Sequence, residues 1–168
     1  FPLVKKLLSL NNKIKGNRNV EVILLSRNSS DTGLRIFNSI EHHNLDIKRA
    51  VFCSGGSPHA YAKSFGAHLF LSTEASDCRS SMKSGVASAR IFPSSVPFSE
   101  DETLKVAFDG DSVIFSEDSQ SIYDKYGIKA FEKNEKSLAK LPLTGGPFKS
   151  SLFELHKLQK KFLPSNCP

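Results

Sequence analysis

Short apolar runs alternate with helix-like segments along the first half of the chain. Apolar side chains at positions 3, 4, 7, 8 and 10 have the spacing of one helix face. Continuous apolar runs such as 20–25 (VEVILL) are typical of buried strands. We predict strands over 20–25, 49–53, 68–71 and 86–92, and helices after residue 31, over 58–65 and up to Lys83. Strands that alternate with helices predict a parallel sheet covered by helices.

The second half of the chain has a different pattern. Residues 93–103 contain two prolines and several serines, which predicts a linker. The apolar run 104–108 (LKVAF) then predicts one more strand, with Asp109 at its carboxyl end. Three helices are predicted after that strand, over 116–126, 128–137 and 147–162. The predicted fold class is α/β: a Rossmann-like three-layer sandwich with helices on both faces of a parallel sheet and a helical insert after Asp111.

Composition narrows the class of protein. The chain has 168 residues, of which 39% are hydrophobic and 24% charged, so it is long enough for a globular core. No apolar run approaches the roughly 18 residues of a membrane span, so no membrane association is expected. The three cysteines lack CxxC spacing, which favours a reducing, cytoplasmic setting over a disulfide scaffold or zinc site. Because the chain starts at Phe1 without a secretory signal, we expect a piece of a longer or processed protein.

The net charge of +6 is spread along the chain in short clusters. No arginine-rich arm or basic stripe with interleaved aromatic residues is present, so nucleic acid is not an expected partner. A mild positive field suits a small phosphorylated substrate.

The stretch VAFDGDSVIF, residues 106–115, carries the strongest candidate chemistry. One interpretation is an Asp-Gly hairpin turn, which would pair 105–108 with 112–115. A calcium loop is excluded, because Ile114 replaces the sixth-position glycine and Gln120 the twelfth-position glutamate. The third interpretation is a phosphoryl-transfer site, because a carboxylate at the end of a parallel strand faces the crevice where ligands bind.

In that third interpretation the two carboxylates have separate roles. Asp109 attacks phosphorus and forms an acyl-phosphate. Asp111 protonates the leaving oxygen and then deprotonates water. Gly110 between them lets the backbone turn tightly beside the substrate. A magnesium ion would be held by the same oxygen ligands.

An apolar strand that ends in D-x-D resembles the first motif of the haloacid-dehalogenase-like phosphohydrolases. Three longer stretches, 20–47, 106–119 and 143–162, resemble the cytosolic 5'-nucleotidase I family, and the similarity covers nearly the whole chain. The resemblance implies a cytoplasmic hydrolase that converts nucleoside 5'-monophosphates, typically AMP, to nucleoside and phosphate with Mg²⁺. It implies that Asp109 is the nucleophile, that Asp111 is the acid/base, and that both hold the metal.

The resemblance also implies partner motifs, which the sequence supplies only in part. Ser26 follows a predicted strand, where a phosphate-binding hydroxyl belongs, and is a candidate substrate-binding residue. At the next expected places stand His59, with Lys63 further on, and Glu74, with Asp77 inside a predicted helix. The set is incomplete.

A repeat offers another explanation, because residues 1–11 resemble 146–156. We then expect a degenerate Rossmann-like half over 1–92, a linker over 93–103, and over 104–168 the start of a catalytic half that is incomplete at its carboxyl end. A non-catalytic nucleotide-binding or oligomerisation module therefore stays open as the alternative function, and a homo-oligomer stays open as its assembly.

Overall fold

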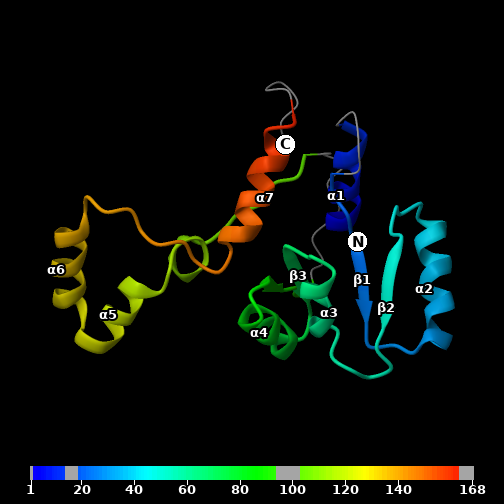
Figure 1. Ribbon diagram of the computed structural model, residues 1–168, viewed down its shortest axis with the longest axis horizontal. Helices are drawn as coiled ribbons and strands as arrows, with labels where there is room; N and C mark the ends of the chain where they lie inside the picture. Colours follow the sequence, from blue (N-terminus) through cyan, green and yellow to red (C-terminus); the bar gives the residue numbers. More distant parts are fainter. Residues whose placement is uncertain (1, 14–18, 94–102, 163–168) are drawn as a thin grey trace.

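A computed structural model describes residues 2–13, 19–93 and 103–162 of the chain (Figure 1). It has α/β architecture, with parallel strands and helices, as the sequence predicts. The predicted linker over 93–103 falls almost entirely outside the described residues. No helix within the described residues is long and apolar enough to cross a membrane.

The first part of the chain follows the predicted alternation of strands and helices. The elements are α1 (Pro2–Lys13), β1 (Ile23–Ser26), α2 (Ser30–His42), β2 (Arg49–Phe52), α3 (His59–Ser64), β3 (Leu69–Ser72), α4 (Ala75–Lys83) and β4 (Ala87–Arg90). Every predicted strand of this part is present. β1, β2 and β4 are shorter than predicted, and β3 has the predicted length but is shifted by one residue. Pro58 precedes α3 as its N-terminal cap, where its missing N–H is not needed.

The strands form two parallel pairs. In the first pair Ile23 lies opposite Arg49 and Ser26 opposite Phe52. In the second pair Leu69 lies opposite Ala87, and β3 and β4 run parallel. Hydrogen bonds among the described strands join β1 only to β2 and β3 only to β4, so the structure has two small sheets where one continuous sheet was predicted.

A small apolar core joins the two sheets. Ala62 of α3, Phe70 of β3 and Val86 are buried together, and Leu25 of β1 packs against them. Apolar side chains of α2 are only partly covered: Leu34 is 66% exposed and Phe37 is 48% exposed. Phe37 still contacts the ring of Phe52 edge-on at 5.7 Å, which places α2 against β2.

The predicted strand over 104–108 is absent: these residues form no strand, and Val106 is 51% exposed. An apolar run forms a strand only when its N–H and C=O groups find a neighbouring strand. Among the described residues this segment has no such pairing, so the prediction of a strand there is wrong for this structure. The hairpin interpretation is also wrong, because 105–108 do not pair with 112–115.

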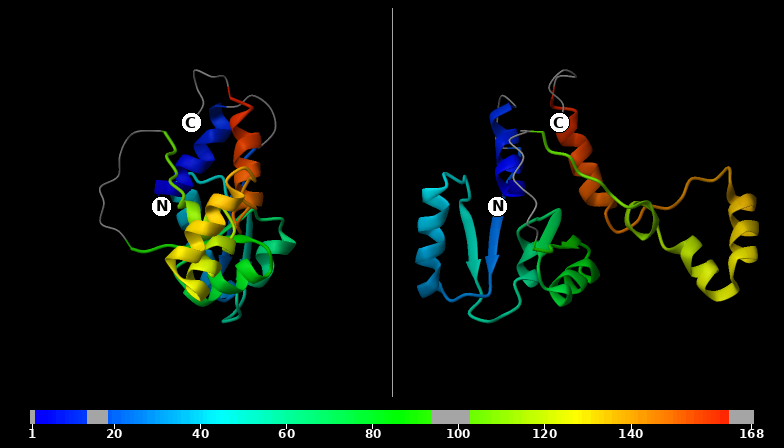
Figure 2. Two further views of the ribbon diagram at one scale, coloured as in Figure 1. Left: turned by 90° about the vertical axis from the view of Figure 1, so that its left-hand side faces the viewer. Right: turned by 180° about the vertical axis from the view of Figure 1, so that it is seen from behind.

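The remaining elements are η1 (Gly110–Ile114), α5 (Asp118–Tyr126), α6 (Ile128–Leu138) and α7 (Lys149–Gln159). Helices α5 and α6 form a hairpin in which the rings of Tyr123 and Phe131 meet edge-on at 6.2 Å. Figures 1 and 2 show this hairpin at one end of the molecule, well separated from both sheets. A helical insert after Asp111 was predicted and is present.

Candidate functional site

Asp111 lies in the short helical turn η1 and Asp109 immediately precedes it as its N-terminal cap; both residues are exposed. Asp109 is extended, with φ −68° and ψ 152°, and its carboxylate accepts a hydrogen bond from the Gly110 N–H at 2.7 Å. Asp111 is also extended, whereas Ser112 has a positive φ of 60°. The carboxylate of Asp109 therefore caps the turn on which both residues are presented to solvent.

The turn is fixed by the segment that leads into α7. The Gly146 N–H donates to the Ile114 carbonyl at 2.7 Å, and the Phe148 N–H donates to the Val113 carbonyl at 3.2 Å. Phe115 and Gly145 form a single antiparallel bridge. A Cβ on Gly146 would lie 2.5 Å from the Val113 carbonyl oxygen, so only glycine allows this approach. The Gly-Gly-Pro sequence was the signal available for this contact.

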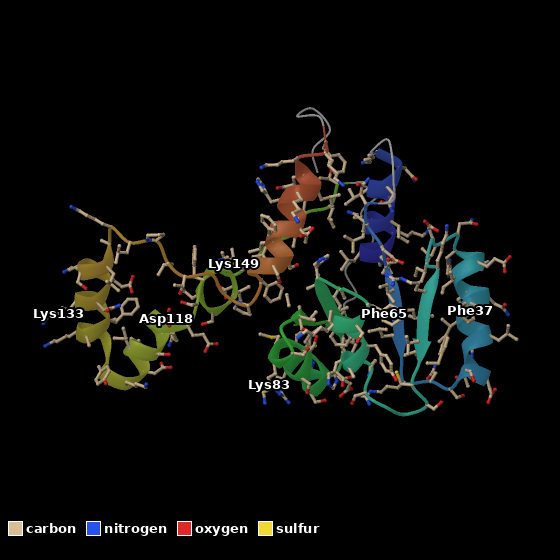
Figure 3. All side chains as sticks on the ribbon, in the orientation of Figure 1. Phe37, Phe65, Lys83, Asp118, Lys133 and Lys149 are labelled. Carbon is tan, nitrogen blue, oxygen red and sulfur yellow. The ribbon has the colours of Figure 1, made fainter. Side chains whose placement is uncertain are left out.

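Side-chain hydrogen bonds among Ser116, Asp118 and Thr144, called the clasp below, join the two ends of the segment that carries the α5–α6 hairpin. The Thr144 hydroxyl donates to Asp118 Oδ2 at 2.8 Å, and the Ser116 hydroxyl donates to the same oxygen at 2.6 Å. These hydrogen bonds, from Ser116 first and Thr144 second, lower the pKa of the Asp118 carboxyl below its usual value. Figure 3 labels Asp118 and Lys149, which stand on either side of the turn.

The carboxylates of Asp109 and Asp111 have the donor chemistry that Mg²⁺ takes, which is one or two protein carboxylates completed by water and substrate. No group of three or more His, Cys, Asp or Glu residues in the described part of the chain could hold a metal ion. Among the described residues, the two carboxylates therefore have the donor chemistry of metal ligands without forming a closed all-protein metal site.

A second polar cluster lies where β1 and β2 end. Arg27 Nη2 contacts both carboxylate oxygens of Asp77, at 2.7 and 2.6 Å. His59 Nδ1 lies 3.4 Å from Asp77 Oδ1. The loops after the two strands are joined by the Cys53 N–H, which donates to the Ser26 carbonyl at 2.9 Å. Sequence reasoning placed Asp77 inside a helix and did not pair it with Arg27, because the partners are fifty positions apart.

The structure does not bring the predicted site residues together. Ser26 ends β1, and its hydroxyl accepts a hydrogen bond from the Asn28 N–H at 3.1 Å. In Figure 1 the carboxyl ends of β1 and β2 lie at the lower right, whereas η1 lies to the left, between α5 and α7. Asp109 and Asp111 therefore form one candidate site, and the cluster around Arg27 and Asp77 forms another.

Comparison with known proteins defines the class. The sequence model of the 5'-nucleotidase family matches residues 1–167, so the chain belongs to the 5'-nucleotidase family. The chain is similar to cytosolic 5'-nucleotidase 1B of Homo sapiens, with 32% identity over 153 residues, 88% of this chain and 25% of that protein. The chain thus spans about a quarter of the length of this relative. No solved structure matches it. The resemblance to the cytosolic 5'-nucleotidase I family is confirmed.

Proposed function

We propose that this protein hydrolyses nucleoside 5'-monophosphates such as AMP to nucleoside and phosphate. The observation that carries the proposal is the family match over residues 1–167, which includes Asp109 and Asp111. The similar human protein is named a cytosolic 5'-nucleotidase, and that name supports a cytoplasmic location for this chain.

The proposed reaction has two steps. A carboxylate oxygen of Asp109 attacks phosphorus, and the bond between phosphorus and the ester oxygen breaks while Asp111 donates a proton to that oxygen. Asp111 then takes a proton from water, whose oxygen attacks the aspartyl-phosphate. The bond between phosphorus and Asp109 breaks, which releases phosphate and restores both residues. The exposure of both carboxylates on η1 supports these roles, because an incoming phosphate ester can reach them.

A divalent metal fits this chemistry, and we propose Mg²⁺ held by Asp109 and Asp111. When bound, the ion would neutralise the repulsion between the Asp109 carboxylate and the phosphate oxygens. As part of the same proposal, the protein is related to the haloacid-dehalogenase-like phosphohydrolases and has their Rossmann-like three-layer fold.

Ser26 is proposed as a substrate-binding hydroxyl. A single site that uses both Ser26 and Asp109 requires the η1 turn and the carboxyl end of β1 to approach each other. The proposal therefore includes a substrate-bound arrangement in which these two parts meet.

The test is phosphate release from AMP in the presence of Mg²⁺ and in the presence of EDTA. We expect release with Mg²⁺, loss of release with EDTA, and loss of release in Asp109→Asn with AMP binding retained. Glu117→Gln is the matched control, since Glu117 is an exposed carboxylate close to the same turn. Release that persists in Asp109→Asn would overturn the assignment of the nucleophile.

The second candidate function is a non-catalytic nucleotide-binding or oligomerisation module. It is favoured by the separation of η1 from the cluster at the end of β1, and by the lack of a third metal-ligand candidate among the described residues. Such a module binds AMP and releases no phosphate, with or without Mg²⁺, in the wild type and in Asp109→Asn alike.

A further inference from the structure

Arg27 and Asp77 form an ion pair in which the aspartate is buried and the arginine is partly exposed. The Asp77 side chain is 3% exposed, whereas the Arg27 side chain is 41% exposed. Asp77 lies in the first turn of α4, where the helix dipole favours a negative charge. The buried carboxylate therefore holds the guanidinium in place while leaving part of it at the surface.

The guanidinium retains hydrogen-bonding capacity. It has five N–H donors, and Nη2 meets both oxygens of Asp77. Nη1 lies 3.5 Å from the carbonyl oxygens of Gly55 and Gly56, at the outer limit of hydrogen-bond length. The Nε–H takes no part in these contacts. Donors thus remain for an anion that approaches the open side.

Backbone hydrogen bonds join the loops around Arg27. The Gly55 N–H donates to the Arg27 carbonyl at 2.6 Å, and the Ser54 N–H donates to the Asn28 carbonyl at 3.1 Å. Ser54 has a φ of 45°, a left-handed conformation that costs a non-glycine residue free energy and is concentrated at functional sites. The cluster also lies at the carboxyl ends of parallel strands, where ligands of α/β proteins bind.

We propose that Arg27, oriented by Asp77, binds a phosphate group at this edge of the β1–β2 sheet. A guanidinium matches phosphate in charge and in planar donor geometry. In this assignment Arg27 is the binding residue, and Asp77 is a positioning residue that acts through it. The assignment is independent of the proposed hydrolysis, because it concerns binding alone.

Binding is measured by titration calorimetry with three probes: AMP, inorganic phosphate, and adenosine, which lacks the phosphate. We expect Arg27→Met to bind AMP and inorganic phosphate about 10- to 100-fold more weakly than the wild type, because a charged hydrogen bond is lost. The affinity of Arg27→Met for adenosine should equal that of the wild type. Loss with AMP alone assigns the site to the nucleotide, and loss with both probes assigns it to phosphate from either source.

Arg49 provides the matched control. It is 43% exposed and paired with Glu21, but it lies at the opposite end of the same sheet, where β2 starts. Arg49→Met should bind AMP within about twofold of the wild type, because Arg49 lies at the end of the sheet away from Arg27 and the loss of its exposed ion pair costs the fold little. Equal affinity of the Arg27→Met and Arg49→Met variants for AMP and phosphate would overturn the proposal, as would a wild type that binds neither probe.

A measurement on the wild type removes the question of whether a variant folds. Phenylglyoxal modifies exposed arginines, and the modified positions are located by mass spectrometry. AMP should slow the modification of Arg27 and leave the rate of modification of Arg49 unchanged. Modification of Arg27 at the same rate with and without AMP would contradict the proposal.

The Asp77→Asn variant tests the positioning role. It should weaken AMP binding about tenfold while Arg27→Lys, which keeps the charge but loses the planar fork, weakens it by a similar factor. Wild-type affinity in folded Asp77→Asn would show that the ion pair only fastens the loops. If the wild type releases no phosphate from AMP yet shows Arg27-dependent binding, the proposed hydrolysis fails and this inference stands.

Discussion

The Thr144 hydroxyl lies 2.8 Å from Asp118 Oδ2 and joins the two ends of the segment that carries α5 and α6. Ser116 donates to the same carboxylate oxygen, so one acidic side chain holds both ends of the hairpin together. The clasp is followed directly by Gly145 and Gly146, which contact the η1 turn. The position of the hairpin is thereby linked to the position of Asp109 and Asp111.

The clasp predicts a pH dependence. Hydrogen bonds from Ser116 and Thr144 lower the pKa of Asp118 from its ordinary value of 3.8. A lowered native pKa contributes stability above the unfolded pKa, and that contribution is lost as the pH falls through the native pKa. Thr144→Val should raise the Asp118 pKa toward its ordinary value, as followed by carboxyl-carbon NMR. An unchanged titration midpoint in Thr144→Val would contradict the clasp.

Gly146→Ala should destabilise the structure. The added methyl group would meet the carbonyl oxygens of Val113 and Phe115, and backbone atoms cannot move aside as a side-chain tip can. We expect a loss of about 1–3 kcal/mol in the free energy of unfolding, measured by urea denaturation. Gly110→Ala is the control, because its methyl group would meet only the Phe115 ring at 4.0 Å. Equal stability of the two variants would argue against the tight contact at Gly146.

Asp111→Asn should separate acid catalysis from nucleophilic attack. Removal of the general acid slows release of a poor leaving group, so AMP hydrolysis should fall by about 100- to 10,000-fold. Release of p-nitrophenol from p-nitrophenyl phosphate in the first turnover should fall much less, since this leaving group needs no proton, whereas the later attack of water on the aspartyl-phosphate is slowed for both substrates. Rapid-quench measurement of leaving-group release in the first turnover with both substrates gives the difference, and equal losses in that step would remove Asp111 from the acid role.

Phe70→Ala tests the core that joins the two sheets. Phe70 is 7% exposed and packs with Ala62 and Val86. Truncation should cost about 3–5 kcal/mol in the free energy of unfolding, the usual range for a buried phenylalanine. Leu34→Ala on α2 is the control, because Leu34 is 66% exposed and its truncation should cost under about 0.5 kcal/mol. A loss at Phe70 no larger than at Leu34 would show that this core does not hold the sheets.

Much of the secondary structure could be predicted from periodicity. The run 49–53 became β2, Arg49–Phe52, and the helix predicted over 128–137 became α6, Ile128–Leu138. These elements depend on local pattern and on breakers such as Gly127, which lies between α5 and α6 with a φ of 76°. For the candidate site, the sequence predicted which residue types could do the chemistry, because the D-x-D spacing is visible along the chain. It did not predict which other residues lie around the two carboxylates.

The sequence by itself determined the α/β class, the family, and the pair Asp109 and Asp111 as the strongest catalytic candidates. Only the tertiary structure decided that 104–108 form no strand and that the pair lies on a turn held by Gly146. Only the tertiary structure brought Arg27 to Asp77. The physical reason is that pairing of an extended segment and contact between distant side chains depend on which groups meet in space, and periodicity along the chain does not record that.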